Sequence, residues 1–203
     1  HWERVRAAIK ACGVEDAIGG FEFLFLIAAD WFAARGCVHT VWEAGIGGRL
    51  DPVRLIAARH VALTALDFEH TALLGDTLEA IALEKIAAAP EGARLFVSEA
   101  AAPVMSAVRE AIEGYCAERG VRTEFVAPVE RVFSLNGAYQ KSNAALAVSM
   151  AQALASISDA QIGAGLASTR WSGRLEVLDA DPLIVIDVGH TPDGVARALE
   201  GFQ

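Results

Sequence analysis

Three polar residues in the first half of the chain, Glu43, His70 and Lys85, are the first candidates for chemistry. A carboxylate and an imidazole can together hold a divalent cation, and two protein ligands leave positions open for water and phosphate oxygens, which is the usual environment of magnesium. Each residue taken alone is weak evidence, because a lone histidine or lysine is more often a solvated surface group than part of a site. If the fold brings them together, the sequence predicts a magnesium site with Glu43 and His70 as ligands and Lys85 nearby.

Two apolar runs would place these residues at one edge of a sheet. Residues 37–42 are rich in β-branched and aromatic side chains, which predicts a short buried strand with Glu43 at its carboxyl end. Residues 60–66 predict a second strand, followed by the polar loop 67–71 that contains His70. Ligands of open α/β sheets bind beyond the carboxyl ends of the strands. Glu43 and His70 would therefore share one edge if the two strands are parallel.

The segment between these strands contains Gly45, Gly47 and Gly48, followed by Arg49 and Asp51. Glycine lets the main chain approach a ligand closely, so the segment is either a binding loop or a tight turn with solvated charges. Its spacing does not match the glycine fingerprint of a dinucleotide-binding site. The sequence also contains no GxxxxGK[ST] phosphate loop, no GxSxG nucleophile elbow and no HExxH zinc helix. These absences exclude a Rossmann dinucleotide cofactor and the two hydrolase classes.

The remaining elements alternate between helices and continuous apolar strands, a pattern typical of α/β domains. Further strands are predicted at residues 94–98 and 123–126, and Asp76 with Glu79 predicts a capping box at a helix start. The segment 21–34 is apolar nearly all round, which predicts a helix that lies between layers. We therefore predict an α/β fold with a mostly parallel, doubly wound sheet. The predicted helices cover residues 2–12, 21–34, 76–90 and 103–119.

The pattern changes after residue 133. Residues 139–143 precede an alanine-rich helix that ends near residue 156, and a shorter helix follows from Asp159. Residues 169–174 are typical of a linker. The strands predicted beyond it, at residues 175–178 and 183–187, lead into a final helix and indicate the start of a second, Rossmann-like domain. We predict a first domain over residues 1–168, a linker over 169–174 and the start of a C-terminal domain over 175–203.

The composition excludes several other classes of protein. The formal net charge of −9 argues against general nucleic-acid binding, which depends on clustered basic residues. The hydrophobic share of 54% is enough for a sizeable core, but the apolar runs are too short to span a membrane, so we expect no membrane association. Three widely spaced cysteines indicate neither a disulfide framework nor a zinc site. A cytoplasmic location is therefore expected.

Seven segments, in this order and at these intervals, resemble the successive signatures of the dihydrofolate synthase and folylpolyglutamate synthase family, within the Mur ligase superfamily. They are Phe21-Glu22, residues 43–51, residues 70–77, Glu84-Lys85, Gln140 with Asn143, residues 171–176 and residues 187–192. The resemblance spans nearly the whole chain and implies a Mur-ligase-like central ATPase domain. The sequence departs from the family pattern at several points, including Glu69, where the family usually has aspartate before the histidine.

The resemblance implies an ATP-dependent amide ligase that phosphorylates a substrate carboxylate and then joins it to the amine of L-glutamate. It implies ATP and Mg²⁺ as cofactors and dihydropteroate or folate as the acceptor. Glu43 and His70 match magnesium ligands, and Lys85 matches a lysine that is carbamylated in this superfamily. Gln140, Asn143 and Arg174 match nucleotide-binding positions. The positions matched as catalytic are Lys85, Asp187 and His190.

The family's phosphate loop lies upstream of the segments matched here, so we expect this chain to be a piece of a longer protein and inactive alone. We expect it to be monomeric. Three alternatives remain open: a Mur-type ligase that acts on a cell-wall precursor, a catalytically silent paralogue that binds nucleotide or a partner, and an α/β domain of another role. By their resemblance to the family pattern, the loop of Glu69, His70 and Thr71 and residues 74–77 favour folate over cell-wall substrates.

Overall fold

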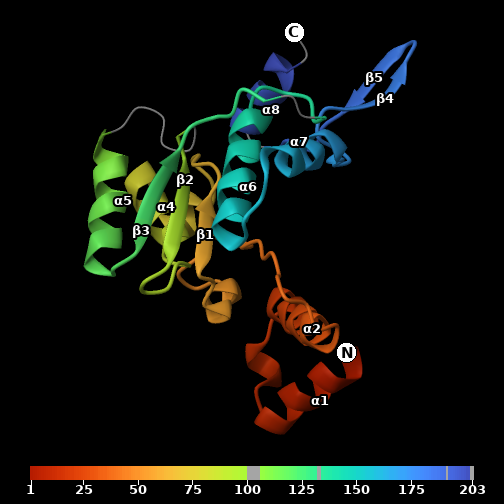
Figure 1. Ribbon diagram of the computed structural model, residues 1–203. Coiled ribbons are helices and arrows are strands. Elements are labelled where there is room, and N and C mark those ends of the chain that lie inside the picture. The colour runs from red at the N-terminus through yellow and green to blue at the C-terminus, as the bar shows by residue number, and fades with distance from the viewer. Residues whose placement is uncertain (100–105, 132–133, 191, 202–203) are drawn as a thin grey trace.

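The computed structural model describes residues 1–99, 106–131, 134–190 and 192–201 (Figure 1). The strands are β1 (His60–Leu63), β2 (Arg94–Ser98), β3 (Arg122–Val126), β4 (Glu176–Ala180) and β5 (Leu183–Ile186). The α-helices are α1 (Trp2–Cys12), α2 (Gly20–Ala34), α3 (Thr71–Leu74), α4 (Leu78–Ile86), α5 (Ser106–Glu118), α6 (Gln140–Leu154), α7 (Asp159–Ser168) and α8 (Pro192–Glu200). Two short 3-10 helices are η1 (Glu15–Ala17) and η2 (Pro52–Ile56). Residues 103–105 of the predicted helix 103–119 lie outside the described residues.

The central unit is a parallel sheet with the strand order β1-β2-β3. The first residues of the strands lie in one row, because His60 pairs with Arg94 and Arg94 pairs with Arg122. Each strand is followed by a helical connection before the next strand begins, as parallel pairing requires. The prediction of an α/β fold with a parallel sheet is therefore confirmed.

Helices cover both faces of this sheet. Leu95 and Val97 of β2 lie in one apolar layer with Ile81 of α4 and Ile112 of α5. Phe96, which points to the opposite face because side chains alternate along a strand, packs in a second layer against α6. Burial on both faces explains why the strand reads as a continuous apolar run.

The start of α4 differs in detail from the sequence prediction, whereas α7 begins at Asp159 as predicted. The cap of α4 is Thr77, whose hydroxyl accepts a hydrogen bond from the Ala80 amide at 3.1 Å, and Asp76 lies outside the helix. The predicted helix was also too long, because α4 ends at Ile86 and not at Pro90. Helix α7 begins with a capping box formed by Ser158 and Gln161. Both starts use a hydroxyl cap, which satisfies an otherwise unpaired backbone amide.

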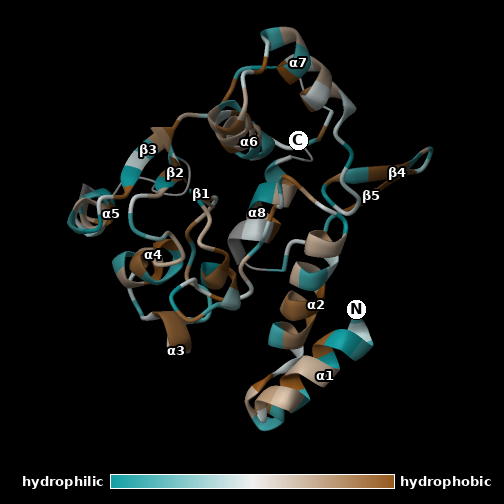
Figure 2. Ribbon diagram, turned by 60° about the horizontal axis from the view of Figure 1, so that its bottom comes forward, coloured by the Kyte–Doolittle hydropathy of each residue, from teal (hydrophilic) through white to brown (hydrophobic). Residues whose placement is uncertain are grey.

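The amino-terminal helices α1 and α2 form an arm that lies apart from the sheet in both views (Figures 1 and 2). Helix α1 ends at Gly13, whose left-handed backbone (φ 65°) closes the helix as predicted. The prediction that α2 lies between layers was wrong for the described chain. Only Phe25 of this helix is buried, whereas Leu24 and Trp31 are exposed. An apolar composition predicted burial, but no second layer of described residues covers this helix.

Residues 37–42 do not form the predicted strand. The side chains of Val38 and Val41 are 87% and 93% exposed, so the apolar run is not buried within the described chain. Trp42 instead packs its ring against the aromatic rings of Phe25 and Phe32, at centroid distances of 4.9 and 5.2 Å. A strand needs a neighbour that accepts its backbone hydrogen bonds, and no strand of the described sheet pairs with this segment.

The carboxyl-terminal part contains the antiparallel hairpin β4–β5 and helix α8. The two predicted strands are observed, and the hairpin extends away from the sheet (Figure 1). Its apolar side chains are exposed, including Leu178, Leu183 and Ile184. The hairpin therefore has strand structure without a core of its own.

Candidate functional site

The glycine segment is held by the carboxylate of Asp51, which is only 6% exposed. One oxygen of this carboxylate accepts hydrogen bonds from the amides of Gly45 at 2.8 Å and Ile46 at 3.3 Å. The other oxygen accepts from the Val53 amide at 2.9 Å and so caps η2. A buried carboxylate is tolerated when several donors satisfy it. Asp51 therefore fixes the shape of the loop.

This loop is docked on the end of α4. The Arg49 amide donates to the Glu84 carbonyl at 3.0 Å, and the Arg49 guanidinium forms an ion pair with the Glu84 carboxylate at 2.7 Å. A Cβ atom on Gly48 would overlap the carbonyl oxygen of Lys85, and one on Gly47 would press against Leu74 of α3. Close packing therefore explains Gly48, and the left-handed backbone of Gly47 (φ 65°) explains the second glycine. The loop lies against α3 and α4 together.

The two predicted metal ligands lie beside this packed unit. Glu43 precedes the loop by two residues, and His70, in a left-handed conformation (φ 49°), begins α3. Both side chains are exposed, and neither makes a hydrogen bond or ion pair within the part of the chain that the structure describes. No group of three or more histidine, cysteine or acidic residues is placed to hold a metal among the described residues. One carboxylate and one imidazole, both open to solvent, suit a magnesium ion that keeps several waters.

Lys85 is engaged by a neighbour of His70. Its amine donates to the carboxylate of Glu69 at 2.5 Å, and both side chains are partly buried. This ion pair ties α4 to the loop that carries His70. Sequence reasoning noted Glu69 only as a departure from the family pattern and did not predict this contact. The structure therefore joins Lys85 to the predicted metal-binding loop through Glu69.

A second group of predicted residues lies at the start of α6. Gln140 is buried, and its side-chain oxygen accepts a hydrogen bond from the amide group of Asn143 at 2.9 Å. Because α6 packs on the sheet through Ala145 and Leu146, this first turn is held firmly by the core. The amide pair of Gln140 and Asn143 could present polar groups to a nucleotide.

The predicted catalytic residue Asp187 lies just after β5, and its carboxylate is already occupied by hydrogen bonds. It accepts from the amides of Gly189 at 2.6 Å and Leu175 at 3.0 Å, and from the hydroxyl of Tyr139 at 3.4 Å. Burial raises the pKa of Tyr139, and the charge of Asp187 raises it further, while the nearby charge of Arg174 lowers it. The contacts join Tyr139 to Asp187, and the charge of Arg174 acts on the same hydroxyl.

His190, three residues after Asp187, is exposed, and its ring nitrogen lies 3.2 Å from the carbonyl oxygen of Val188. Thr191, the next residue of the predicted motif, lies outside the described residues. Sequence reasoning missed Asn136, whose side-chain amide donates to the carbonyl of Leu175 at 2.9 Å. No sequence signal identifies Asn136, because the contact joins residues 39 positions apart.

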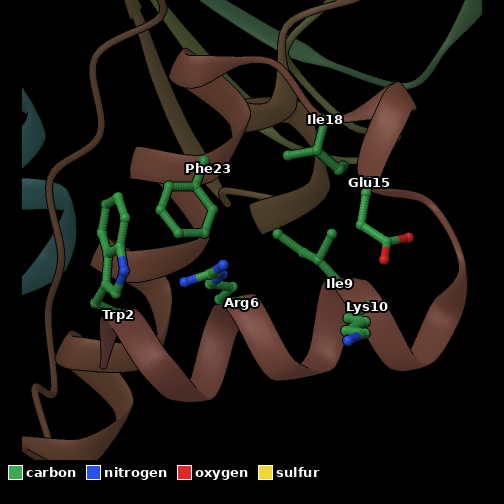
Figure 3. A pocket seen from close by; sticks show the side chains of 7 residues that line it. All are labelled: Trp2, Arg6, Ile9, Lys10, Glu15, Ile18 and Phe23. Atoms are coloured by element: carbon green, nitrogen blue, oxygen red, sulfur yellow. The ribbon is translucent and has the colours of Figure 1, made fainter.

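A hollow in the amino-terminal arm lies away from these residues. It has a volume of about 440 Å³ and lies between α1 and residues 15–23 (Figure 3). The rings of Trp2 and Phe23 meet edge to face at one end, and Arg6 points toward the space between them and Ile9 (Figure 3). It contains none of the predicted site residues.

No helix in the described parts of the chain is long and apolar enough to cross a membrane. No family model matches the sequence. A curated relative, the folylpolyglutamate synthase of Saccharomyces cerevisiae (strain YJM789), is 33% identical over 208 residues, which is 91% of this chain and 37% of the relative. The chain spans between 25% and 37% of the length of the first curated relatives that it matches.

Solved structures give the same result. A folylpolyglutamate synthase bound to AMPPCP and folate matches with a TM-score of 0.85 and 26% identity, over 97% of this chain and 55% of that one. The bifunctional folylpolyglutamate synthase/dihydrofolate synthase of Yersinia pestis, complexed with AMPPNP and manganese, matches with a TM-score of 0.80 over 98% of this chain and 51% of that one. At 24% identity, the second match supports the fold alone.

Proposed function

The chain belongs to the folylpolyglutamate synthase and dihydrofolate synthase family, and from this premise we propose that it forms part of an ATP-dependent ligase that adds L-glutamate to dihydropteroate, to folate, or to both. In this reaction a substrate carboxylate attacks the γ-phosphorus of ATP, which releases ADP and forms an acyl phosphate. The amine of glutamate then attacks the acyl carbon, and inorganic phosphate leaves. The product is an amide.

Such phosphoryl transfer depends mainly on positioning and on neutralising charge. Glu43 and His70 would hold the magnesium ion, which supplies positive charge next to the phosphates. Arg174 would bind phosphate oxygens through its planar guanidinium, and Gln140 with Asn143 would contact the nucleotide. His190 and Lys85, which match catalytic positions of the family, would lie next to the reacting groups. Asp187 belongs to the same constellation, through its contacts with Tyr139 and Leu175.

The observation that carries this proposal is the state of Glu43 and His70. Both are exposed and free of protein partners among the described residues, although the loops that bear them are tightly packed through Gly47, Gly48 and α4. Free ligands on a fixed support are what a metal site needs before the metal binds.

The domain limits follow the same proposal. Residues 1–168 would belong to the central ATPase domain, residues 169–174 would be the linker, and residues 175–203 would begin the C-terminal domain. The exposed apolar side chains of β4 and β5 support a C-terminal unit that is larger than the described hairpin. The activity, substrates and oligomeric state of the longer protein are part of this proposal.

One contact favours the catalytically silent alternative. The lysine expected to carry a carbamate, Lys85, is engaged by Glu69 at 2.5 Å. A carbamate would turn the lysine into an anion, which the Glu69 carboxylate would repel. A chain in which this ion pair persists could retain nucleotide binding and lose ligation.

The test is an assay of the longer protein that contains this chain, with ATP, magnesium and L-glutamate, and with dihydropteroate or folate as acceptor. We expect ADP release that depends on the acceptor and an amide product detectable by mass spectrometry. The variants Glu43→Ala and His70→Ala should lose at least a hundredfold in kcat and need more magnesium. The matched controls Glu110→Ala and His39→Ala alter exposed residues outside the site and should retain activity.

Nucleotide binding without amide formation by the wild-type protein would favour the silent paralogue. Ligation of a cell-wall precursor, with neither folate nor dihydropteroate accepted, would assign the protein to the other branch of Mur-type ligases. Unchanged magnesium dependence in both site variants would overturn the metal assignment even if ligation is observed.

A further inference from the structure

Leu175, the residue that follows the linker, is held from two directions. Its amide donates to the Asp187 carboxylate at 3.0 Å, and its carbonyl accepts from the Asn136 side chain at 2.9 Å. The side chain is buried, and the backbone is left-handed (φ 45°), which is unfavourable for a residue other than glycine. Both backbone hydrogen-bonding groups of this residue are therefore satisfied in a conformation that the isolated segment would avoid.

The carboxylate of Asp187 is held by three donors of the protein. Its two oxygens accept from the amides of Leu175 and Gly189 and from the hydroxyl of Tyr139. Each of these donors belongs to the protein, and two are backbone amides. An acid used in this way fixes the backbone around it.

Tyr139 and Asn136 belong to the other side of the junction. Tyr139 immediately precedes α6, so it is next to Gln140 and four residues before Asn143. The linker residue Gly173 is also fixed, because its carbonyl accepts from the Val188 amide at 3.0 Å. The contacts of Tyr139, Asn136, Leu175 and Asp187 therefore connect the first turn of α6 to both the linker and the segment after β5.

We propose that Tyr139, Asn136 and Asp187 are positioning residues that clamp Leu175 and thereby set where Arg174 and His190 lie relative to the first turn of α6. Arg174 directly precedes the clamped residue, and His190 follows Asp187 by three residues. The clamp deepens the proposed ligase function and depends on it for its catalytic consequence, although its structural part can be tested separately. It gives Asp187 a positioning role beside the catalytic role that the sequence predicts.

The structural test is limited trypsin digestion of the 203-residue chain. Trypsin cuts after arginine, and the bond between Arg174 and Leu175 can enter the protease only when the clamp opens. Tyr139→Phe removes one hydrogen bond and should accelerate cleavage at this bond about three- to tenfold, because opening becomes more frequent. Asn136→Ala removes a different contact of Leu175 and should have an effect of the same size.

Two controls separate this effect from general loosening. Tyr115→Phe makes the same chemical change in α5, away from the clamp, and should leave the cleavage rate after Arg174 unchanged. Cleavage after Arg94, inside β2, reports global unfolding. The proposal fails if the two clamp variants do not accelerate cleavage after Arg174, or if cleavage after Arg94 increases by the same factor.

The catalytic test uses the longer protein once its ligase activity is established. Tyr139→Phe should lower kcat about tenfold and leave the KM for ATP within about twofold, because the nucleotide-binding groups remain but Arg174 and His190 are less often in place. Since Tyr139 acts through Asp187, the double variant Tyr139→Phe/Asp187→Asn should be no slower than Asp187→Asn alone. Additive losses would overturn the shared role.

An inactive wild-type protein would count against the proposed function and not against the clamp, which the digestion tests without any activity. Accelerated digestion with an unchanged kcat in an active enzyme would overturn the positioning role of the clamp.

Discussion

Strands β2 and β5 have nearly the same kind of sequence and very different surroundings. Leu95, Phe96 and Val97 of β2 are 0% exposed, whereas Leu183 of β5 is 58% exposed. Strand β2 has a neighbour on each side and helices on both faces, while β4 is the one strand among the described residues that pairs with β5. A run of apolar residues therefore specifies an extended strand, but the layers around it decide how much free energy the run contributes.

The largest expected effect compares one residue from each strand. Phe96→Ala should lower the free energy of unfolding by about 3–5 kcal/mol, because it removes a ring from the layer between the sheet and α6 and leaves a cavity. Leu183→Ala should lower it by less than about 1 kcal/mol, because little apolar area leaves the protein interior. Urea unfolding followed by circular dichroism measures both values.

Similar losses for the two variants would break the comparison, because they would mean that the hairpin is covered in solution. A second chain packed on the hairpin would have that effect, and the loss at Leu183 would then depend on protein concentration. Measuring both variants at two concentrations separates these cases.

The same contrast explains what the sequence could predict. Residues 94–98 were predicted as a buried strand and are one, because their partners lie in nearby segments of the same chain. Residues 37–42 also have an apolar pattern, but Val38 and Val41 are exposed, and the segment forms no strand because no strand of the described sheet pairs with it. Periodicity and composition report the preference of a segment, and they do not report whether a partner is present.

The candidate site shows the same limit. The free residues Glu43 and His70 could be chosen from the sequence by their chemistry, by their places after apolar runs and by family resemblance. The contacts that fix their loops could not, since Asp51 binds amides five and six residues upstream and Lys85 binds Glu69 across 16 positions. Whether a carboxylate is free or occupied depends on the folded backbone, and a sequence pattern records only that the acid is present.

The second prediction compares an occupied acid, Asp51, with a free one, Glu43, which lies just before the same loop. Asp51→Ala should lower the free energy of unfolding by about 2–3 kcal/mol, because three backbone amides lose a charged acceptor in a buried position. Glu43→Gln should change it by less than about 0.5 kcal/mol, because Glu43 is exposed. Both values come from the same urea titration.

A large loss for Asp51→Ala beside a small one for Glu43→Gln would mean that the loop is fixed by polar contacts, whereas β2 is fixed by buried apolar area. Asp51→Asn is the matched conservative variant, which retains one acceptor oxygen and should lose less than Asp51→Ala. A loss at Glu43 as large as that at Asp51 would contradict the assignment of Glu43 as a free ligand, since it would reveal a structural partner.

The smallest expected effect concerns pH. It can be tested only in the sheet β1-β2-β3, because β4 and β5 contain no histidine. Burial lowers the pKa of His60, and the positive charges of Arg94, Arg59 and Arg122 lower it further. The folded chain therefore binds a proton at this site less readily than the unfolded chain does. Its stability contribution is fully present above the unfolded value of about 6.5 and is lost as the pH falls through that value toward the lower folded pKa.

The measurement is the free energy of unfolding at several pH values between about 8 and 5, for the wild type and for His60→Asn. The variant should lack the part of the acid-side decline that His60 causes, so the difference between the two curves should grow as the pH falls. Arg59→Gln removes one of the three repelling charges and should give an intermediate slope. A wild-type curve that declines less steeply than the His60→Asn curve would mean that the folded chain binds the proton more readily, in which case the arginines do not act on His60 as their placement at the starts of the strands implies.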